Sequence, residues 1–146
     1  MANCEIYNYR EIRSQNRSFA WKTKGDSEVI LALHHASKSK SPGVLTARQH
    51  AEWIAQLNGM YAFALWDAET KHLLLARDPL GIKPLVRTSV DGSLLFASES
   101  KALSAHEGHV PEINQEALVA RLAWEYTLDG TTLLKEVTQI RPGTVE

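Results

Sequence analysis

The sequence predicts an α+β domain, with antiparallel hairpins in its centre and helices toward both ends. Apolar residues recur at helical spacing after Asp26 and again after Thr46. Two short apolar runs lie close together at 60–66 and 73–76, and the turn signal Asp91-Gly92 separates a further pair of strand-like segments. The chain has 146 residues, 44% of them apolar and 23% charged, so it can bury a core of ordinary composition.

Two helices and a strand are expected in the first forty residues. Asn8, with Glu11 three positions later, resembles a helix start and predicts a short helix over 9–15. Residues 19–23 alternate enough to form a strand. Asp26 stands where the cap of the second helix should be, because one helical face follows it. That face carries Val29, Ile30, Leu33 and His34.

A third helix is expected after Thr46. Thr46 and Gln49 have the spacing of a capping box, and Asn58-Gly59 can end the helix in a left-handed conformation. Its inner stripe is expected to consist of Ala47, Ala51, Ile54 and Ala55.

The middle of the chain is expected to form hairpins. The runs at 60–66 and 73–76 are short, apolar and bounded by turn residues, which is typical of strands covered on both faces, and 67–71 would connect them. Asp91-Gly92 predicts a tight turn between 85–88 and 94–97.

The end of the chain predicts two helices and a turn. Ser98-Glu99 is expected to cap a short helix, and Asn114 to cap a longer one. The inner face of the longer helix should hold Leu118, Leu122 and Trp124, and residues 141–143 should form a terminal turn.

Composition excludes several classes of protein. The net charge of −1 does not favour nucleic acid or an anionic membrane as a partner. No apolar run approaches the roughly 20 residues of a membrane helix, and no signal peptide is recognisable, so a cytoplasmic protein is expected. The single cysteine, Cys4, rules out an intramolecular disulfide. His34 and His35 are adjacent and so point to different sides of a helix, and His106 and His109 lack an accompanying acidic or cysteine cluster, so no metal site is expected.

Four sequence blocks stand out in order: Asn3-Cys4-Glu5-Ile6-Tyr7-Asn8, Gly25-Asp26-Ser27-Glu28, ARDPLGIKPL at 76–85 and FASESKAL at 96–103. In this order they resemble the glutamine-hydrolysing domain of asparagine synthetases, which are class II glutamine amidotransferases. The resemblance extends to Pro142-Gly143. It implies the αββα sandwich of N-terminal nucleophile hydrolases, in which two sheets pack face to face between helical layers. Residues 1–146 would be a partial glutaminase domain, incomplete at the N-terminus.

The resemblance also implies a site and a function. The family hydrolyses glutamine and supplies ammonia for ATP-dependent amidation of aspartate. The side chain of Asn3 and the backbone N–H of Cys4 would be oxyanion donors, Asn3 and Glu5 would line the substrate pocket, and Asp26 would bind the substrate's ammonium group. Arg77 and Asp78 are expected to form a structural ion pair.

The resemblance further implies partners and cofactors. Glutamine would be the ligand, and a synthetase domain, in cis or in trans, the partner; a homodimer is also compatible. No cofactor is expected in this chain, since ATP and Mg would be bound only by the synthetase domain.

The family's nucleophile has no counterpart here. It is a cysteine at the first position of the mature chain, where its own α-amine serves as base. Cys4 instead matches the family's glycine, and removal of Met1 would expose Ala2, so Cys4 is not expected to be the nucleophile. A cysteine there is expected to crowd and strain the turn.

Other departures from the family pattern concern whole segments. The upstream His-Arg-Gly-Pro-Asp region, the arginine segment that holds the substrate carboxylate and the synthetase domain have no counterpart. Gly25 replaces a serine, and Val86-Arg87 replaces an aromatic pair.

Three interpretations therefore stay open. The chain could be part of an asparagine synthetase, a non-catalytic remnant that acts as an interaction domain, or the glutaminase part of a related amidotransferase with another acceptor.

Because the activated nucleophile is missing, this chain alone should not hydrolyse glutamine. Loss of a covalent nucleophile lowers the rate by a factor on the order of 10⁴ or more. An ammonia-release assay on the purified protein measures this. Turnover comparable to that of an intact synthetase, abolished by Cys4→Ala, would contradict the expectation.

Overall fold

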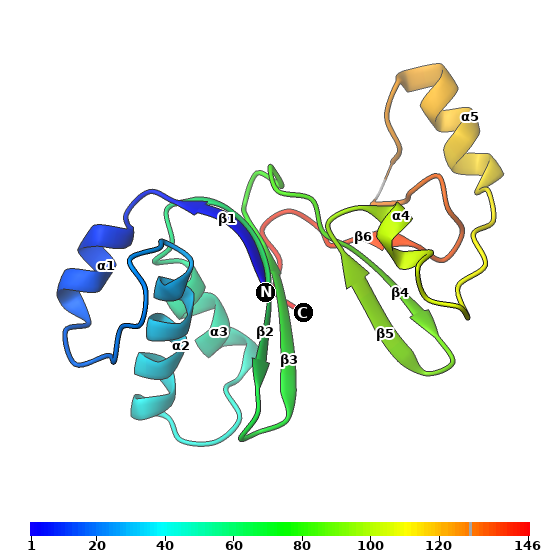
Figure 1. Ribbon diagram of the computed structural model, residues 1–146. Coiled ribbons are helices and arrows are strands. Elements are labelled where there is room, and N and C mark those ends of the chain that lie inside the picture. The colour runs from blue at the N-terminus through cyan, green and yellow to red at the C-terminus, as the bar shows by residue number, and fades with distance from the viewer. Residues whose placement is uncertain (129) are drawn as a thin grey trace. The chain divides into compact units, whose positions relative to one another are not determined.

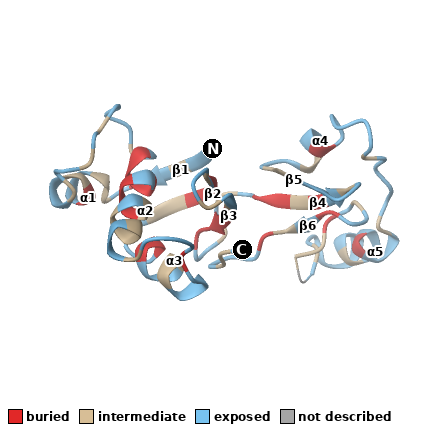
Figure 2. Cartoon of the chain, turned by 90° about the horizontal axis from the view of Figure 1, so that it is seen from below, coloured by how far each residue is buried: buried red, intermediate tan, exposed pale blue. Residues whose placement is uncertain are grey.

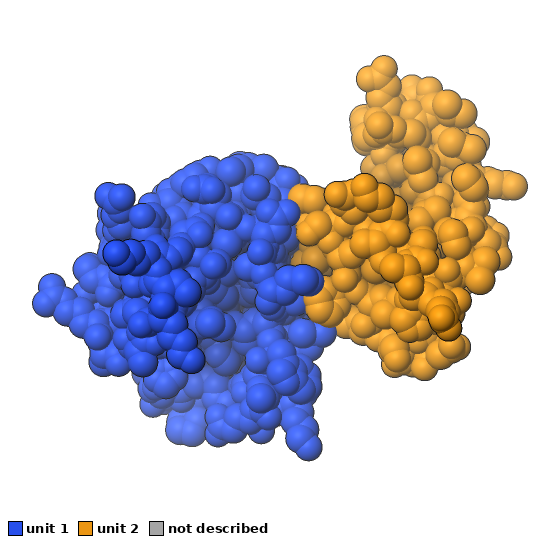
Figure 3. Space-filling view, in the orientation of Figure 1, with its two compact units in different colours: residues 1–83, 143–146 blue, residues 84–142 orange. Residues whose placement is uncertain are grey.

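The computed structural model describes residues 1–128 and 130–146, which form two compact units (Figures 1 and 3). Unit 1 comprises Met1–Lys83 and Gly143–Glu146, and unit 2 comprises Pro84–Pro142. Each unit holds one three-stranded antiparallel sheet together with helices. The expected α+β class is confirmed.

Unit 1 places three helices on one face of its sheet (Figure 1). The sheet has the strand order β1-β2-β3, so β1 lies at an edge. In chain order the elements are β1 (Ala2–Ile6), α1 (Tyr9–Gln15), α2 (Glu28–Lys40), α3 (Ala47–Ile54), β2 (Gly59–Asp67) and β3 (His72–Arg77). The expected helix over 9–15 and the hairpin of β2 and β3 are confirmed.

The core of unit 1 lies between the helices and the sheet (Figure 2). The inner face of α2 is confirmed, since Val29, Ile30 and Leu33 are buried. The stripe expected for α3 is wrong, because its three alanines are exposed and Trp53 is buried with Ile54. The Trp53 ring stacks on Phe63 of β2 at 6.0 Å. A large aromatic ring removes far more apolar surface from water than alanines do, which explains this orientation of the helix.

Gly59 brings β1 and β2 together. The capping box of Thr46 and Gln49 starts α3 as expected, but Gly59 does not end that helix. It is the first residue of β2, opposite Ile6. A Cβ on Gly59 would lie 2.2 Å from the carbonyl oxygen of Glu5 and 2.8 Å from the Cα of Ile6. Only glycine permits this close approach of the two strands.

Two further local expectations for unit 1 are wrong. Asn8 does not cap α1 with its side chain; it donates to the carbonyl of Gln56 at 2.8 Å and accepts from the N–H of Asn58 at 3.0 Å. Residues 19–23 are not a strand. The backbone donors of Lys22 and Thr23 bind the Glu28 carboxylate instead of a neighbouring strand.

Unit 2 is built on a second hairpin. Its elements are β4 (Val86–Val90), β5 (Ser93–Ala97), α4 (Ser100–Leu103), α5 (Gln115–Trp124) and β6 (Thr138–Gln139), with strand order β5-β4-β6. Asp91 and Gly92 both have positive φ, 48° and 77°, as a type I′ turn requires. The expected hairpin is confirmed.

The helix ends of unit 2 follow the sequence less closely. Asn114 caps α5 by accepting the N–H of Ala117 at 3.1 Å, as expected. The expected inner face of α5 is wrong: Leu122 and Trp124 are 78% and 63% exposed, and Ala117 is the buried residue of the helix. Glu99 precedes α4 without a side-chain capping bond and pairs with Lys101.

The expected turn at the end of the chain is confirmed. Gly143 has φ 67°, and its N–H donates to the Asp78 carbonyl at 2.9 Å. Within the described residues, the helices are too short and too polar to cross a membrane.

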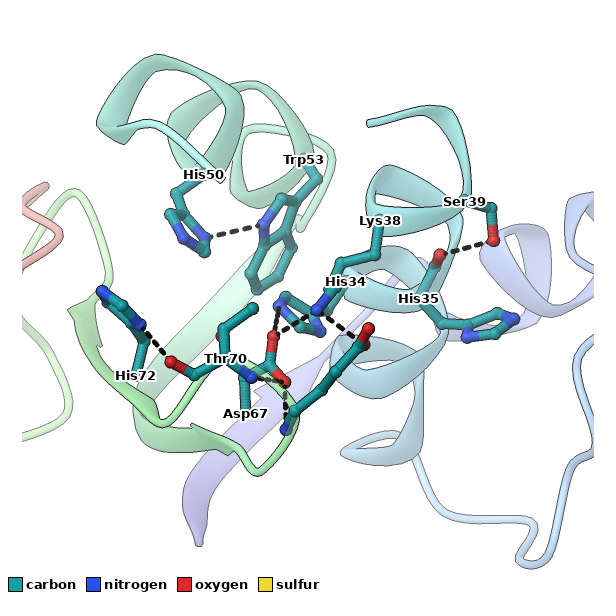
Figure 4. Close-up of polar contacts among 10 residues, drawn as sticks. His34, His35, Lys38, Ser39, His50, Trp53, Asp67, Thr70 and His72 are labelled. Atoms are coloured by element: carbon teal, nitrogen blue, oxygen red, sulfur yellow. Dashed lines mark hydrogen bonds and ion pairs between the residues drawn. The ribbon is translucent and has the colours of Figure 1, made fainter. Parts of the chain in front are cut away.

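Unit 1 also contains a histidine cluster that sequence reasoning missed (Figure 4). The rings of His34 on α2 and His50 on α3 stack at 6.0 Å, and His34 Nε2 lies 4.0 Å from the Asp67 carboxylate. Trp53 donates its indole N–H to His50 Nδ1 at 3.2 Å. Indole is only a donor, so His50 Nδ1 must be unprotonated in this arrangement.

The charges around these rings come from every packed element. Lys38 of α2 binds Asp67 at 2.8 Å and Glu69 at 2.9 Å, while His35 and His72 lie on α2 and β3. Burial lowers the pKa of His34 and also the pKa of His50. At each histidine this effect outweighs the charge of Asp67, which acts in the opposite direction. Lys38 holds the pKa of Asp67 well below its usual range, so that this carboxylate stays ionised in mild acid.

The stability of unit 1 should therefore fall as the pH drops below about 6.5. Because the folded protein lowers the pKa of both histidines, the unfolded chain binds more protons below about pH 6.5. Stability is fully present above that pH and is lost as the pH falls. Urea unfolding followed by tryptophan fluorescence at a series of pH values measures the effect.

The matched controls are two histidine-to-glutamine variants. His50→Gln keeps an acceptor for Trp53 and should reduce the pH dependence, whereas His106→Gln, an exposed residue of unit 2, should not. An unchanged slope in His50→Gln would assign the effect to other groups.

Candidate functional site

The outer edge of β1 carries the backbone N–H of Cys4, which the family resemblance implies as an oxyanion donor. Tyr7 donates its N–H to the Asn58 carbonyl, and Met1 accepts from Ala64, so the odd-numbered residues of this segment face β2. Alternate residues of an antiparallel strand point their backbone groups to opposite sides. The N–H groups of Cys4 and Ile6 therefore face away from β2. The bond from Ile6 to Asp26 agrees with this direction.

Asp26 joins the start of α2 to this edge. One carboxylate oxygen accepts the Ile6 N–H at 2.8 Å and lies 3.9 Å from the Cys4 thiol, and the other accepts the Ser27 N–H at 2.9 Å. The helix cap is Ser27, so the expectation that Asp26 is the cap is wrong by one residue. A carboxylate has about four acceptor positions, so Asp26 can still bind a cationic group.

The structure separates the expected site residues into two sets. Side chains alternate along a strand, so Asn3 and Glu5 project from the face of the sheet opposite Cys4. Both are exposed, and neither side chain bonds to any of the described residues. Asp26 lies next to the Cys4 thiol and the Ile6 N–H. Asn3 and Glu5 are neighbours of Cys4 in the sequence, but their side chains lie on the other face of the sheet.

The thiol of Cys4 is poorly suited to nucleophilic attack. Burial, followed by the charge of Asp26 and the hydrogen bond to it, raises its pKa to about 11. The nucleophile of such chemistry is the thiolate, which is scarce at neutral pH with this pKa. The expected strain at Cys4 is wrong, because the residue lies inside β1 and is not among those with positive φ.

Glu28 organises the segment before Asp26, a role that sequence reasoning missed. The residue is 8% exposed, and its carboxylate accepts the N–H of Lys22 at 2.7 Å, the N–H of Thr23 at 2.8 Å and the Thr23 hydroxyl at 2.7 Å. The bond from Lys22 contributes most to lowering the pKa of Glu28. The available signal was a glutamate two residues after Asp26 in a recognised block.

Arg77 and Asp78 both bind main-chain groups, and the ion pair expected between them stays a prediction. Arg77 donates to the carbonyls of Lys83 and Gly81, both at 2.8 Å. Asp78 is 1% exposed, and four backbone N–H groups hold its pKa below the usual range against the opposing effect of burial. These donors belong to Tyr61, Leu80, Ile82 and Lys83.

The histidines of the cluster do not form a metal-ligand set. His50 accepts from Trp53 at Nδ1, so its other nitrogen carries the proton and cannot coordinate a metal. Across residues 1–128 and 130–146, no group of three or more His, Cys, Asp or Glu side chains is placed to hold a metal ion.

The chain is similar to known glutamine amidotransferase domains over its whole length. A model of the glutamine amidotransferase domain matches residues 1–146. Glutamine-hydrolysing asparagine synthetase 1 of Bacillus subtilis is 34% identical over 143 residues, which cover 97% of this chain and 21% of the relative. Asparagine synthetase 2 of Arabidopsis thaliana is 40% identical over 104 residues, covering 70% of this chain and 16% of the relative. The chain thus spans about a fifth of the length of such relatives.

Solved structures agree with the fold. A glutamine phosphoribosylpyrophosphate amidotransferase from B. subtilis, complexed with ADP and GMP, has a TM-score of 0.59 at 24% identity. It matches 78% of this chain and 24% of its own length. An allosteric regulatory enzyme of purine biosynthesis has a TM-score of 0.56 at 27% identity, over 70% of this chain and 21% of its own.

The thiol of Cys4 should be alkylated slowly at neutral pH. A pKa of about 11 in place of 9.0 leaves about 100-fold less thiolate at pH 7.5, so iodoacetamide should react about 100-fold more slowly with the folded than with the urea-unfolded protein. Asp26→Asn should accelerate the reaction, since it removes the carboxylate charge. Fast alkylation of the folded protein at pH 7.5 would show that Cys4 is a reactive thiol.

Proposed function

The chain belongs to the family of glutamine amidotransferase domains, and we propose that the edge of β1 with Asp26 is its binding site for the amino-acid end of glutamine. The observation that carries the proposal is the position of the Asp26 carboxylate. It is held at the free edge of β1 by the N–H groups of Ile6 and Ser27. An α-ammonium group is a strong charge-assisted partner for such a carboxylate.

The other site residues take complementary roles in this proposal. The N–H of Cys4 points from the same edge and, with the amide of Asn3, would donate to the oxyanion of a tetrahedral intermediate. Glu5 would contact the substrate from the opposite face of the strand. Cys4 contributes its backbone and not its thiol, because the thiol stays protonated at neutral pH.

For the longer protein, we propose the role of the glutaminase part of an asparagine synthetase. It would hydrolyse glutamine and pass ammonia to a synthetase domain, in cis or in trans, that amidates aspartate with ATP and Mg. The support is the 34% sequence identity to asparagine synthetase 1 of Bacillus subtilis, which extends over 97% of this chain. A homodimer is part of the same proposal. The αββα sandwich is the finer architecture proposed, supported by the two three-stranded sheets.

Asp26→Asn should abolish most of the affinity for glutamine. Removing one partner of a charge-assisted pair costs about 2–5 kcal/mol, since the ligand's ammonium is left unpaired. Asparagine keeps an acceptor for the Ile6 N–H, so the fold should survive. Isothermal titration of the purified chain with L-glutamine measures the dissociation constant.

A ligand control separates ammonium recognition from general binding. 4-Carbamoylbutanoate lacks only the α-amino group of glutamine, so the wild type should bind it weakly and Asp26→Asn should not distinguish the two ligands. Asp91→Asn, in the exposed turn of unit 2, serves as the matched variant. Equal affinity of wild type and Asp26→Asn for L-glutamine would reduce Asp26 to a structural residue.

A further inference from the structure

We propose that Glu28 and the hydroxyl of Thr23 form a positioning relay that sets the Asp26 carboxylate for glutamine. The inference rests on the proposed function of Asp26 and adds two residues that do not touch the ligand. Its basis is an unbroken series of hydrogen bonds from a buried carboxylate to the residue just before Asp26.

The relay begins at Glu28, the first residue of α2. The Thr23 hydroxyl donates to the Glu28 carboxylate at 2.7 Å and accepts the N–H of Gly25 at 3.2 Å. Gly25 is the immediate neighbour of Asp26. The one hydroxyl therefore connects a carboxylate that the helix fixes to the backbone of the loop that presents Asp26.

A second set of contacts keeps the Thr23 end of the relay in place. Arg13 of α1 donates to the Thr23 carbonyl at 2.9 Å, and its guanidinium lies 4.0 Å from the centre of the Trp21 ring. One of its nitrogens is 3.7 Å from the Glu28 carboxylate. Thr23 is thus bound through its N–H, its carbonyl and its hydroxyl, although it belongs to no helix or strand.

The hydroxyl has a role that the backbone bonds of this segment cannot replace. The N–H of Thr23 is bound to Glu28 with or without a hydroxyl, so α2 and residues 22–23 stay joined when it is removed. The N–H of Gly25, in contrast, then loses its acceptor. The predicted consequence is a looser segment between Thr23 and Ser27, and with it a less well placed Asp26. A loss of placement near 1 Å is enough to weaken a charge-assisted contact strongly.

The surroundings of Gly25 leave room for a side chain at this position. A Cβ on Gly25 would lie 3.6 Å from the Thr23 hydroxyl, which is ordinary contact. The serine found at this position in the family pattern would therefore fit, and the hydroxyl of Thr23 would still reach the backbone.

The test compares Thr23→Val, which has nearly the same shape without a hydroxyl, with Thr23→Ser, which keeps it. Thr23→Val should weaken L-glutamine binding by about 10-fold or more, and Thr23→Ser should bind within about 2-fold of the wild type. Amide hydrogen exchange at Ile6, whose N–H donates to Asp26, should accelerate about 10-fold in Thr23→Val alone.

A matched variant distinguishes positioning from stability. Thr46→Val removes the capping hydroxyl of α3, which also lowers the melting temperature of unit 1, but it should change neither glutamine affinity nor Ile6 exchange. Unchanged affinity and exchange in Thr23→Val overturn the relay, as does an equal change in Thr46→Val. If the wild type does not bind glutamine, the proposed function fails, and Ile6 exchange still decides whether the relay positions Asp26.

Discussion

The hydrogen bond between Asp26 and the N–H of Ile6 is the contact on which the candidate site depends. It joins the start of α2 to the outer edge of β1 at 2.8 Å, across 20 residues of sequence. Both partners are placed by other interactions. Ile6 is fixed because glycine at position 59 lets β1 approach β2 closely, and Asp26 is fixed because the segment before it is bound to Glu28. The site therefore depends on the positions of both β1 and the start of α2.

The charge of Asp26 has opposite consequences for the two groups that it could face. A carboxylate favours a nearby ammonium group and disfavours a nearby thiolate. The pKa of Cys4 is raised mainly by burial and then by the negative charge of Asp26, which disfavours the thiolate. The carboxylate proposed to bind the ammonium end of glutamine therefore also disfavours the thiolate form of Cys4. The same physical argument agrees with the proposed binding role of Asp26 and disfavours the Cys4 side chain as a nucleophile.

The two units differ in how they use their apolar residues. In unit 1, three helices cover one face of the sheet, and large side chains such as Trp53 and Phe63 are almost fully buried. In unit 2, α5 is capped by Asn114 and buries Ala117, while its larger apolar side chains are exposed. A helical apolar pattern shows that a face can be buried, but the pattern does not supply the neighbour that would bury it.

The sequence by itself determined the α+β class, both hairpins, the capping signals at Thr46 and Asn114 and the family, because these depend on local spacing and on motifs read in order. The expectation that Cys4 is not the nucleophile also came from the sequence, because Cys4 matches the glycine of the family motif. Tertiary structure alone decided which side of α3 is buried, since that depends on the partner of Trp53. It likewise decided that Asn3 and Glu5 project from the face opposite Cys4, and that His34, His50 and Asp67 meet. The relay from Glu28 through Thr23 to Gly25 also needed the structure, because residues 19–23 alternate like a strand. The N–H groups of Lys22 and Thr23 bind the buried Glu28 carboxylate instead of a neighbouring strand. The local sequence pattern does not show which of these two partners they bind.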